Sequence, residues 1–446
     1  MHRLLPLLKI GAILFITLLM LLPVERIRGL IHERQALRDQ VVEEVARADA
    51  HAQVLTGPVL VVPFTRTERV EEQGRDGRPV TVRREVNGEL RLLPAVLDVD
   101  GTLRIEERRR GIYRARVYRA DMRLAGVLEI PQHYGVAEDV ESYRFGTPHL
   151  ALGISDIRGI GNALVLRADG AAVPFRPGTG TELLASGVHA PLPIATPAGP
   201  RRIQYEITLA LAGTGEFSMV PVGRETHVRL ASDWPHPGFV GEFLPREKQI
   251  SAQGFKASWQ TSFFSTNLEE LLARCGSASP AACGEFHARR FGVSFVDPVD
   301  QYLKSERAAK YAFLFIGLTF AGFFLAEVLK GTSVHPVQYG LVGLALAMFF
   351  LLLLSLSEHI GFTAAYLVST VACVGLVTYY VVHVLDSRAQ GAGFGVMLAS
   401  LYALLYGILS SEDYALLMGS LLVFGILAVI MVLTRRVSWN NLGVSR

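Results

Sequence analysis

The feature that most constrains this chain is a series of long apolar runs. Five of them follow one another near the C-terminus, at about 309–329, 337–356, 362–385, 393–410 and 414–433. A helix that crosses the hydrocarbon core of a bilayer needs roughly 20 consecutive apolar residues, and each run is close to that length. A sixth run, 4–22, is interrupted only by Lys9, whose long side chain can reach the near headgroups. The sequence therefore predicts six membrane-spanning helices.

The first run could instead be a cleaved signal peptide. However, it is long for the apolar part of such a peptide, and VERIRG, which follows it, contains no A-x-A-like cleavage site. We therefore expect residues 1–24 to remain as a signal anchor.

The segment between the first two runs has a different character. The chain as a whole is 50% hydrophobic and 19% charged, yet residues 25–308 are rich in Arg and Glu, like a soluble domain. We expect an extramembrane domain at 25–308, a five-span membrane domain at 309–434 and a tail at 435–446. Because the domain meets the membrane at both of its ends, spans one and two should lie side by side. The net charge of +3 gives no support for nucleic-acid binding.

The distribution of Lys and Arg predicts the orientation, since short cytoplasmic loops carry an excess of both. With the N-terminus inside, six spans return the C-terminus to the cytoplasm. The inner segments then carry Arg3, Lys330, Arg388, Arg435 and Arg436, whereas the outer loops SEHIG and SSED carry no Lys or Arg. The sequence therefore predicts a membrane protein with both termini cytoplasmic and the large domain outside the cytoplasm, in the periplasm if the cell has one.

Period-two alternation and turn residues predict a β-rich outer domain. After RGLIHERQALRDQVVEEVARADA, expected to be a helix continuing from the first span, GPVLVVPF, TLRIEE and GIYRARVYRADMRL have the pattern of strands. Further short strands are expected near 162–167, 202–212, 225–231 and 290–296, and NLEELLARC is expected to be a helix. We predict a sandwich-like domain, with one core or two subdomains.

The cysteines allow two interpretations. Cys275 and Cys283 frame CGSASPAAC, whose Gly, Ser and Pro suit a tight loop, and an oxidising compartment would permit a disulfide there. Two free thiols are the alternative. The spacing matches no zinc site. Cys373 lies within a span and is expected to be a small core residue.

Several segments together resemble one family. They are HERQALRDQVVEEVA, TGPVLVVPF, RRRGIYRARVY, PHPGFVGEFLPREKQISAQGFKASWQ, and the long stretch from VDQYLKSERAAKYAF to SEHIGF. In this order they resemble the CreD family of bacterial inner-membrane proteins, also called cell envelope integrity proteins. The resemblance implies an inner-membrane location and a role in envelope stress, in responses to cell-wall damage through a two-component system. It supplies no reaction and no catalytic residues.

Polar side chains within spans are costly and are therefore functional candidates. Glu327 lies in FFLAEVLKG, with Lys330 three residues further on, and His335 and His383 fall near cytoplasmic ends. These four residues are expected at one membrane depth. Glu327 and Lys330 could be an interfacial pair, or the carboxylate could face the bundle interior as a proton or cation site.

Two further groups of residues are candidates. Glu358 and His359 belong to SEHIG, expected to be an external turn that either faces water or binds a domain residue or a ligand headgroup. A basic run, with Tyr113 and Tyr118 interleaved, could bind a polyanion such as lipid phosphate or a wall polymer, or be a solvated strand face paired with Glu. Its residues are Arg108, Arg109, Arg110, Arg114 and Arg116.

Known catalytic motifs are absent from the sequence. It contains no G-x-x-x-x-G-K-[ST], G-x-S-x-G, H-E-x-x-H or G-x-G-x-x-G. The close glycines of GAGFG, at 391–395, fit small-residue helix packing instead. We expect no cofactor, and the bilayer, an envelope protein or a cell-wall component as partners.

Three hypotheses follow from these observations. The first, which we favour, is a non-enzymatic scaffold or component of the envelope stress response. The second is a small transporter or lipid-handling protein that uses Glu327 and the nearby histidines. The third is a periplasmic binding module or enzyme on a membrane anchor.

Overall fold

The chain folds into two compact units. The computed structural model describes residues 4–73, 79–276, 280–295, 300–330, 334–410 and scattered positions between 417 and 432. One unit, the helical unit, comprises Met1–Arg38 and Val299–Arg446, and the other, the β-rich unit, comprises Asp39–Pro298. The β-rich segment is thus inserted into the helical one, as expected; the predicted domain bounds stay a prediction.

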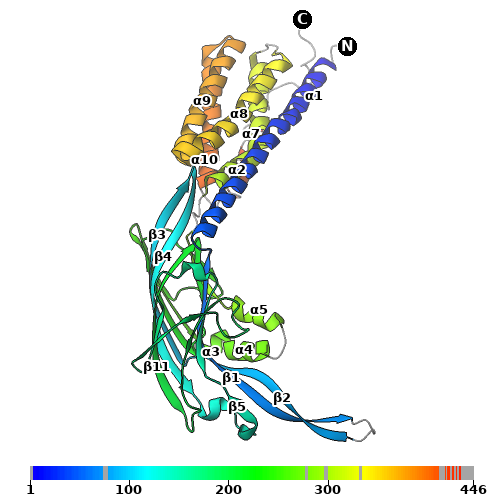
Figure 1. Cartoon of the computed structure of the whole chain (residues 1–446). Coiled ribbons are helices and arrows are strands. Elements are labelled where there is room, and N and C mark those ends of the chain that lie inside the picture. The colour runs from blue at the N-terminus through cyan, green and yellow to red at the C-terminus, as the bar shows by residue number, and fades with distance from the viewer. Residues whose placement is uncertain are drawn as a thin grey trace. The chain divides into compact units, whose positions relative to one another are not determined.

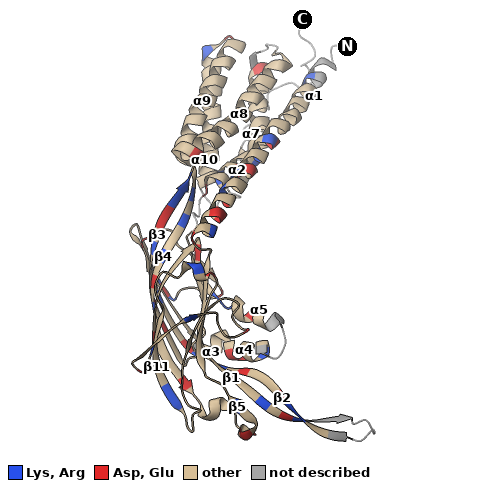
Figure 2. Cartoon of the chain, in the orientation of Figure 1, with Lys and Arg blue, Asp and Glu red and all other residues tan. Residues whose placement is uncertain are grey.

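The helical unit consists of helices, most of them long and apolar. They are α1 (Leu4–Leu19), α2 (Leu21–Ala48, which continues into the β-rich unit), α6 (Gln301–Lys310), α7 (Ala312–Lys330), α8 (Pro336–Ile360), α9 (Phe362–Val384) and α10 (Arg388–Ser410). In Figure 2, Lys, Arg, Asp and Glu are sparse on α7–α10. Apolar side chains cover most of α1 and α7–α10, as a span through lipid requires, whereas α6 and most of α2 carry many charged residues.

Part of the span prediction is confirmed. Among the described residues, four helices are long and apolar enough to cross a membrane, and α6 with α7, bent by 45° at Tyr311, makes a fifth if counted as one span. The predicted run at 414–433 lies mostly outside the described residues. A multi-helical apolar unit is therefore established, and the count of six stays a prediction.

The interior of the helical unit is built on aromatic rings and glycines. The ring of Phe349 on α8 lies 5.5 Å from Tyr366 on α9 and 4.5 Å from Tyr402 on α10. A Cβ added at Gly391 would meet Val382 at 2.2 Å, and one at Gly395 would meet Thr378 at 2.4 Å. The glycines of GAGFG therefore allow α9 and α10 to approach closely, as predicted.

The β-rich unit consists mainly of strands. They are β1 (Gln53–Gln73), β2 (Pro79–Leu92), β3 (Val96–Arg110), β4 (Tyr113–Ile130), β5 (Tyr143–Phe145), β6 (His149–Ile154), β7 (Val165–Ala168), β8 (Ala171–Pro174), β9 (Arg176–Pro177), β10 (Gly187–Pro191), β11 (Arg201–Thr214), β12 (Glu216–Val220), β13 (Glu225–Ser232), β14 (Gly238–Gly241), β15 (Glu247–Ser251), β16 (Gly254–Ser262) and β17 (Phe291–Ser294). Three short helices accompany them: α3 (Phe263–Thr266), α4 (Leu268–Gly276) and α5 (Pro280–Ala288). Single 3₁₀ turns lie at Gln132–Gly135, Val140–Ser142 and Ile157–Gly159.

These strands form two sheets. One runs β14-β17-β12-β1-β6-β10-β9, with β2 and β5 also paired to β1, and the other runs β15-β16-β13-β3-β4-β11-β7-β8. The pairs β1–β12 and β3–β13 are parallel, although each joins segments far apart in the sequence. Figure 1 shows β1 and β2 extending beyond the other strands of this unit as a two-stranded ribbon.

Both sheets share a single hydrophobic core. Leu55 and Val61 of the first sheet belong to the same buried cluster as Leu97, Leu124 and Ile207 of the second. This arrangement agrees with a sandwich-like domain and favours one core over two subdomains. The helices α4 and α5 contribute Leu272 and Phe286 to that cluster.

Two local predictions are corrected. SEHIG is not a turn, because α8 continues to Ile360 and only Gly361, with φ +77°, separates it from α9. Ser357 is buried in this helix, and its hydroxyl is satisfied by donating to the Leu354 carbonyl at 2.8 Å. The segment CGSASPAAC is not a simple loop either, since Cys275 lies in α4 and Cys283 in α5.

Candidate functional site

Glu327 on α7 lies inside the helical unit, where it is 5% exposed. Its carboxylate accepts hydrogen bonds from Lys9 Nζ of α1, from Tyr339 Oη of α8 at 2.8 Å, and from the Val334 backbone N–H at 3.0 Å. We call Lys9, Glu327, Val334 and Tyr339 the Glu327 cluster. Both carboxylate oxygens are bonded, and three separate segments hold one acid.

The surroundings of this cluster are apolar. The Tyr339 ring packs 4.8 Å from Phe323 and 5.6 Å from Phe320. An isolated carboxylate in such a place would be strongly destabilising, whereas one with a cation and two further donors is tolerated. Glu327 therefore faces the bundle interior, and its ion pair with Lys9 confirms that the first and second predicted spans are neighbours.

The two histidines expected near Glu327 do not join this cluster. The Nδ1 atom of His335 accepts from the Val337 N–H at 3.3 Å, and the His335 N–H donates to Gln338 Oε1 at 3.0 Å, which caps the start of α8. His383 is exposed, and its Nδ1 lies 2.8 Å from the Tyr379 carbonyl. Within the described part of the chain, neither imidazole contacts Glu327. The side chain of Lys330 lies outside the described residues.

A second acidic group joins three helices of the helical unit. We call Arg34, Arg38, Asp300, Tyr302 and Glu358 the Glu358 cluster. The Glu358 side chain on α8 is 7% exposed; it accepts from Tyr302 Oη of α6 at 3.1 Å and lies 3.9 Å from Arg34 Nε of α2. Asp300 binds Arg38 of α2 and caps α6 by accepting from the Tyr302 N–H at 3.1 Å. Glu358 thus binds residues of the helical unit itself, and its predicted contact with the outer domain or a ligand headgroup stays a prediction.

His359 does not belong to that cluster. It is exposed, and its Nδ1 lies 3.1 Å from the Ser355 carbonyl of the same helix. Glu358 and His359 therefore differ, because Glu358 contacts other helices and His359 faces outward.

The basic run forms the end of the β3–β4 hairpin, and nearby acids pair with most of it. Arg108 lies 3.0 Å from Glu106, Arg109 lies 2.6 Å from Glu107, and Arg114 lies 3.5 Å from Glu107. Arg110 binds Glu44 of α2.

Arg116 and Tyr118 differ from the rest of that run. Arg116 donates to the Phe295 carbonyl at 3.2 Å and stacks 4.2 Å from the Trp234 ring. Tyr118, expected among the exposed arginines, is fully buried and donates to the Glu216 carbonyl at 3.0 Å. These contacts favour the solvated, acid-paired face over the polyanion site.

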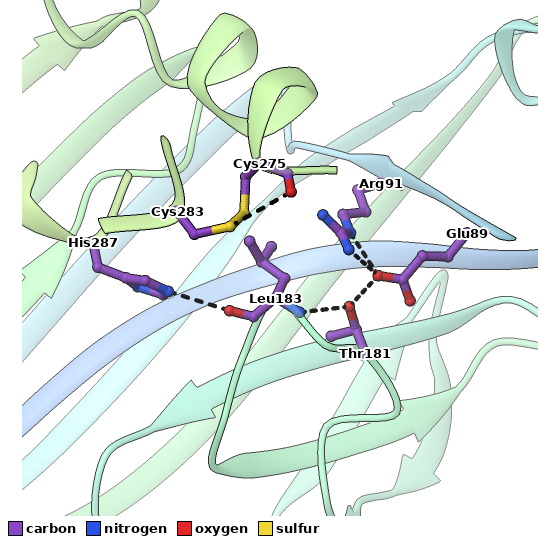
Figure 3. Close-up of a disulfide and its surroundings, with 7 residues drawn as sticks. All are labelled: Glu89, Arg91, Thr181, Leu183, Cys275, Cys283 and His287. Atoms are coloured by element: carbon purple, nitrogen blue, oxygen red, sulfur yellow. Dashed lines mark hydrogen bonds and ion pairs between the residues drawn. A yellow bond between two sulfur atoms is a disulfide. The ribbon is translucent and has the colours of Figure 1, made fainter. Parts of the chain in front are cut away.

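Cys275 and Cys283 form a disulfide, with their Cα atoms 4.7 Å apart. Of the two interpretations, the disulfide is confirmed. Figure 3 shows this bridge beside the segment of Thr181 and Leu183, where His287 of α5 lies 3.2 Å from the Leu183 carbonyl. The bridge therefore joins α4 to α5 at the place where the pair meets the β-rich core.

A groove of the β-rich unit lies next to α4. It has a volume of about 1380 Å³ and is lined by β2, by the adjoining ends of β4 and β11, and by α4. Its floor includes Leu90, Leu92 and Leu272, and its rim carries the ion pairs Arg91–Glu89, Arg202–Glu129 and Arg224–Glu269. Neither the groove nor its residues were predicted, since the strands that form it are far apart in sequence.

The comparisons with known proteins agree with the family resemblance. The profile of the family described as "Inner membrane protein CreD" matches residues 6–440. The Inner membrane protein CreD of Escherichia coli (strain K12) is 36% identical over 431 residues, which cover 97% of this chain and 93% of that protein.

A structural match of lower quality also exists. An M1 zinc metallopeptidase from Deinococcus radiodurans matches with a TM-score of 0.19 and 11% identity over 38% of this chain and 39% of its own, too little to support an argument. Among the described residues, no group of three or more His, Cys, Asp or Glu could hold a metal. The family profile and the relative decide the assignment: the chain belongs to the CreD family of inner membrane proteins.

Proposed function

We propose that the protein is a non-enzymatic component of the bacterial envelope's response to cell-wall damage, with its β-rich unit in the periplasm. In this proposal six spans anchor the chain, both termini are cytoplasmic, and the helical unit is a rigid base. The family assignment supports the inner-membrane location. The Lys and Arg of the short loops support the orientation.

One observation carries the choice of a rigid base over a transporter. The buried carboxylate of Glu327 is occupied on both oxygens by donors from Lys9, Tyr339 and Val334. A proton or cation site that works in a transport cycle must exchange its occupant. A carboxylate held by three partners from different segments suits a permanent tie between helices.

The test shows whether the Glu327 carboxylate only holds helices together or is itself needed for transport. Glu327→Gln leaves the Lys9 ammonium without its acid, at a cost of about 3 kcal/mol. We expect a low protein level and poor rescue of a strain that lacks its own copy, grown with a β-lactam. Adding Lys9→Met removes the uncompensated charge, so the double variant should recover both level and rescue.

A matched control excludes a general effect of removing acids. Glu25, whose side chain is 71% exposed, is changed to Gln and should behave as wild type. A double variant that is present at the wild-type level but fails to rescue would show that the carboxylate itself is needed. That outcome would favour the transport or lipid-handling hypothesis.

A further inference from the structure

One edge of β2 has no strand beside it. In the described part of the chain, β2 pairs only with β1, along Leu60↔Leu92 to Gln73↔Pro79. An open edge presents unpaired main-chain N–H and C=O groups, which proteins usually cover, shorten or protect with charges. The edge of β2 is long, so its role needs an explanation.

The groove runs along this edge. Seven successive residues, 87–93, line it, whereas β1 contributes only Pro63 and Phe64. Because successive side chains of a strand point to opposite faces, a groove lined by every residue of a segment must follow its edge rather than one face. Over seven residues the edge is roughly 23 Å long. A volume of about 1380 Å³ exceeds that of usual small-molecule pockets and suits a chain-like ligand.

The ribbon beyond the groove also lacks a neighbour. β5 pairs with β1 only at Phe64–Arg66, so the pairs from Thr67↔Glu85 onward form two strands with no described third (Figure 1). Val82 and Val86 on this ribbon are 38% and 37% exposed. Two strands alone are marginally stable in water, and a third strand would stabilise them.

We propose that the open edge of β2 binds an extended polypeptide segment, which adds to the sheet as a strand and lies in the groove. Main-chain hydrogen bonds to the edge would provide affinity, and side chains on alternate positions would provide specificity. The inference rests on the proposed function only in taking the partner to be an envelope protein.

The two faces of the groove define the chemistry of this segment. Leu90, Leu92 and Leu93 pack against the core cluster that includes Leu272. On the other face, Glu89 accepts from Thr181 at 2.6 Å and pairs with Arg91 at 2.5 Å. The fitting segment therefore alternates apolar and polar residues.

A second copy of this chain is the competing occupant, because its own β2 edge is also open, and the oligomeric state is therefore measured as well.

The probes are fluorescent decapeptides. Unmodified peptides can form main-chain hydrogen bonds with the edge of β2, whereas N-methylated ones cannot. One alternates valine with lysine, a second alternates valine with glutamate, and a third alternates valine with serine. Each has a partner peptide N-methylated at five successive central residues. Anisotropy is measured with the full-length protein in detergent. We expect at least one decapeptide to bind and its N-methylated form to bind at least tenfold more weakly, because strand addition needs the main-chain N–H groups.

A pair of matched variants locates the site. Ala273 on α4 is exposed and lines the groove, so Ala273→Trp should obstruct part of it and weaken peptide binding at least tenfold. Ala288, exposed at the end of α5 outside the groove, gives the control Ala288→Trp, which should bind within twofold of wild type.

Three results would overturn the inference. They are equal binding of the N-methylated peptide, no binding of any decapeptide, and binding of a chitin hexasaccharide instead. Sedimentation showing a dimer that Ala273→Trp converts to a monomer would also overturn it, by making a second copy the occupant. Binding is read directly here, whereas the proposed function is read from rescue, so either can fail alone.

Discussion

At the scale of single residues, Asp156 shows how one carboxylate can organise the start of the β-rich unit. It accepts from Arg158 Nη2 at 2.6 Å and from the His51 N–H at 3.1 Å. The hydrogen bond from Arg158 is the largest reason that the pKa of Asp156 lies well below its usual range, and His51 acts in the same direction. Asp156 thereby fixes the chain where it leaves α2.

We predict that Asp156→Asn lowers the free energy of unfolding by about 2 kcal/mol at neutral pH, because charge-assisted hydrogen bonds are lost. Two of the chain's three tryptophans, Trp234 and Trp259, lie in the β-rich unit, so their fluorescence during denaturation of the full-length protein measures the change. Asp139→Asn is the control, since Asp139 is exposed and its side chain makes no capping bond.

The same carboxylate predicts a pH dependence. The pKa of Asp156 is lower in the folded protein than its ordinary value of 3.8. Its contribution to stability is therefore complete above that value and is lost as the pH falls below it. The difference between wild type and Asp156→Asn should shrink in that acid range. A difference that stays constant there would mean that the ionised form is not what stabilises the fold.

The residues of the helical unit show what sequence reasoning can find. Glu327 stood out because a carboxylate inside an apolar run is unusual. Its partner Lys9 is 318 positions away and looked like an interfacial lysine, and Tyr339 looked like any aromatic residue of a span. The sequence thus identifies the costly group, but only the packing of α1, α7 and α8 shows which groups satisfy it.

At the scale of elements, the Glu358 cluster joins α2, α6 and α8. Two donors approach Glu358 differently: Tyr302 Oη is at 3.1 Å, whereas Arg34 Nε is at 3.9 Å on a side chain that is 46% exposed. An exposed ion pair at that distance contributes little, while a hydrogen bond to a buried carboxylate contributes more. The hydroxyl should therefore be the stronger tie.

Double-mutant cycles test this ranking. We predict a coupling of about 1.5 kcal/mol between Tyr302→Phe and Glu358→Gln, from the charge-assisted hydrogen bond. Between Arg34→Met and Glu358→Gln we predict less than about 0.5 kcal/mol. Reversible unfolding of the full-length protein in mixed micelles gives both values. A larger coupling for Arg34 would contradict the ranking.

Helices and strands were predicted correctly where the periodicity of apolar residues shows which side chains are buried. The alternation of GIYRARVYRADMRL predicts β4, and the apolar runs predict α7 to α10. The prediction failed where tertiary contacts override composition. SEHIG looked like a turn, yet Ser357 and Glu358 lie in α8, where Ser357 is buried and the Glu358 carboxylate accepts from Tyr302 of α6. The break at Tyr311 left no clear signal in the apolar pattern.

At the scale of the whole molecule, long-range strand pairing was the part that could not be predicted. The parallel pairs β1–β12 and β3–β13 join strands separated by much of the β-rich unit. Local periodicity shows that a strand has a buried face but not which strand lies beside it. The groove beside β2 depends on such pairings, so it too could not be predicted.

The placement of the β-rich unit outside the cytoplasm is the prediction that concerns the whole chain. Cysteines at two exposed positions report on it: Ala171→Cys in β8 and Ala389→Cys at the start of α10. A maleimide that crosses the outer but not the inner membrane should label Ala171→Cys in intact cells. Ala389→Cys should react only after the inner membrane is permeabilised, because the loop before α10 is predicted to face the cytoplasm.

The wild-type protein provides the background for this experiment. Cys275 and Cys283 are bonded to each other and Cys373 is 4% exposed, so the native cysteines should stay unlabelled. The disulfide is itself consistent with this placement, since such bonds persist in oxidising compartments and are rare in the cytoplasm. Labelling of Ala389→Cys but not Ala171→Cys in intact cells would invert the topology. A groove on β2 would then face cytoplasmic polypeptides, and the envelope partner proposed for it would have to be abandoned.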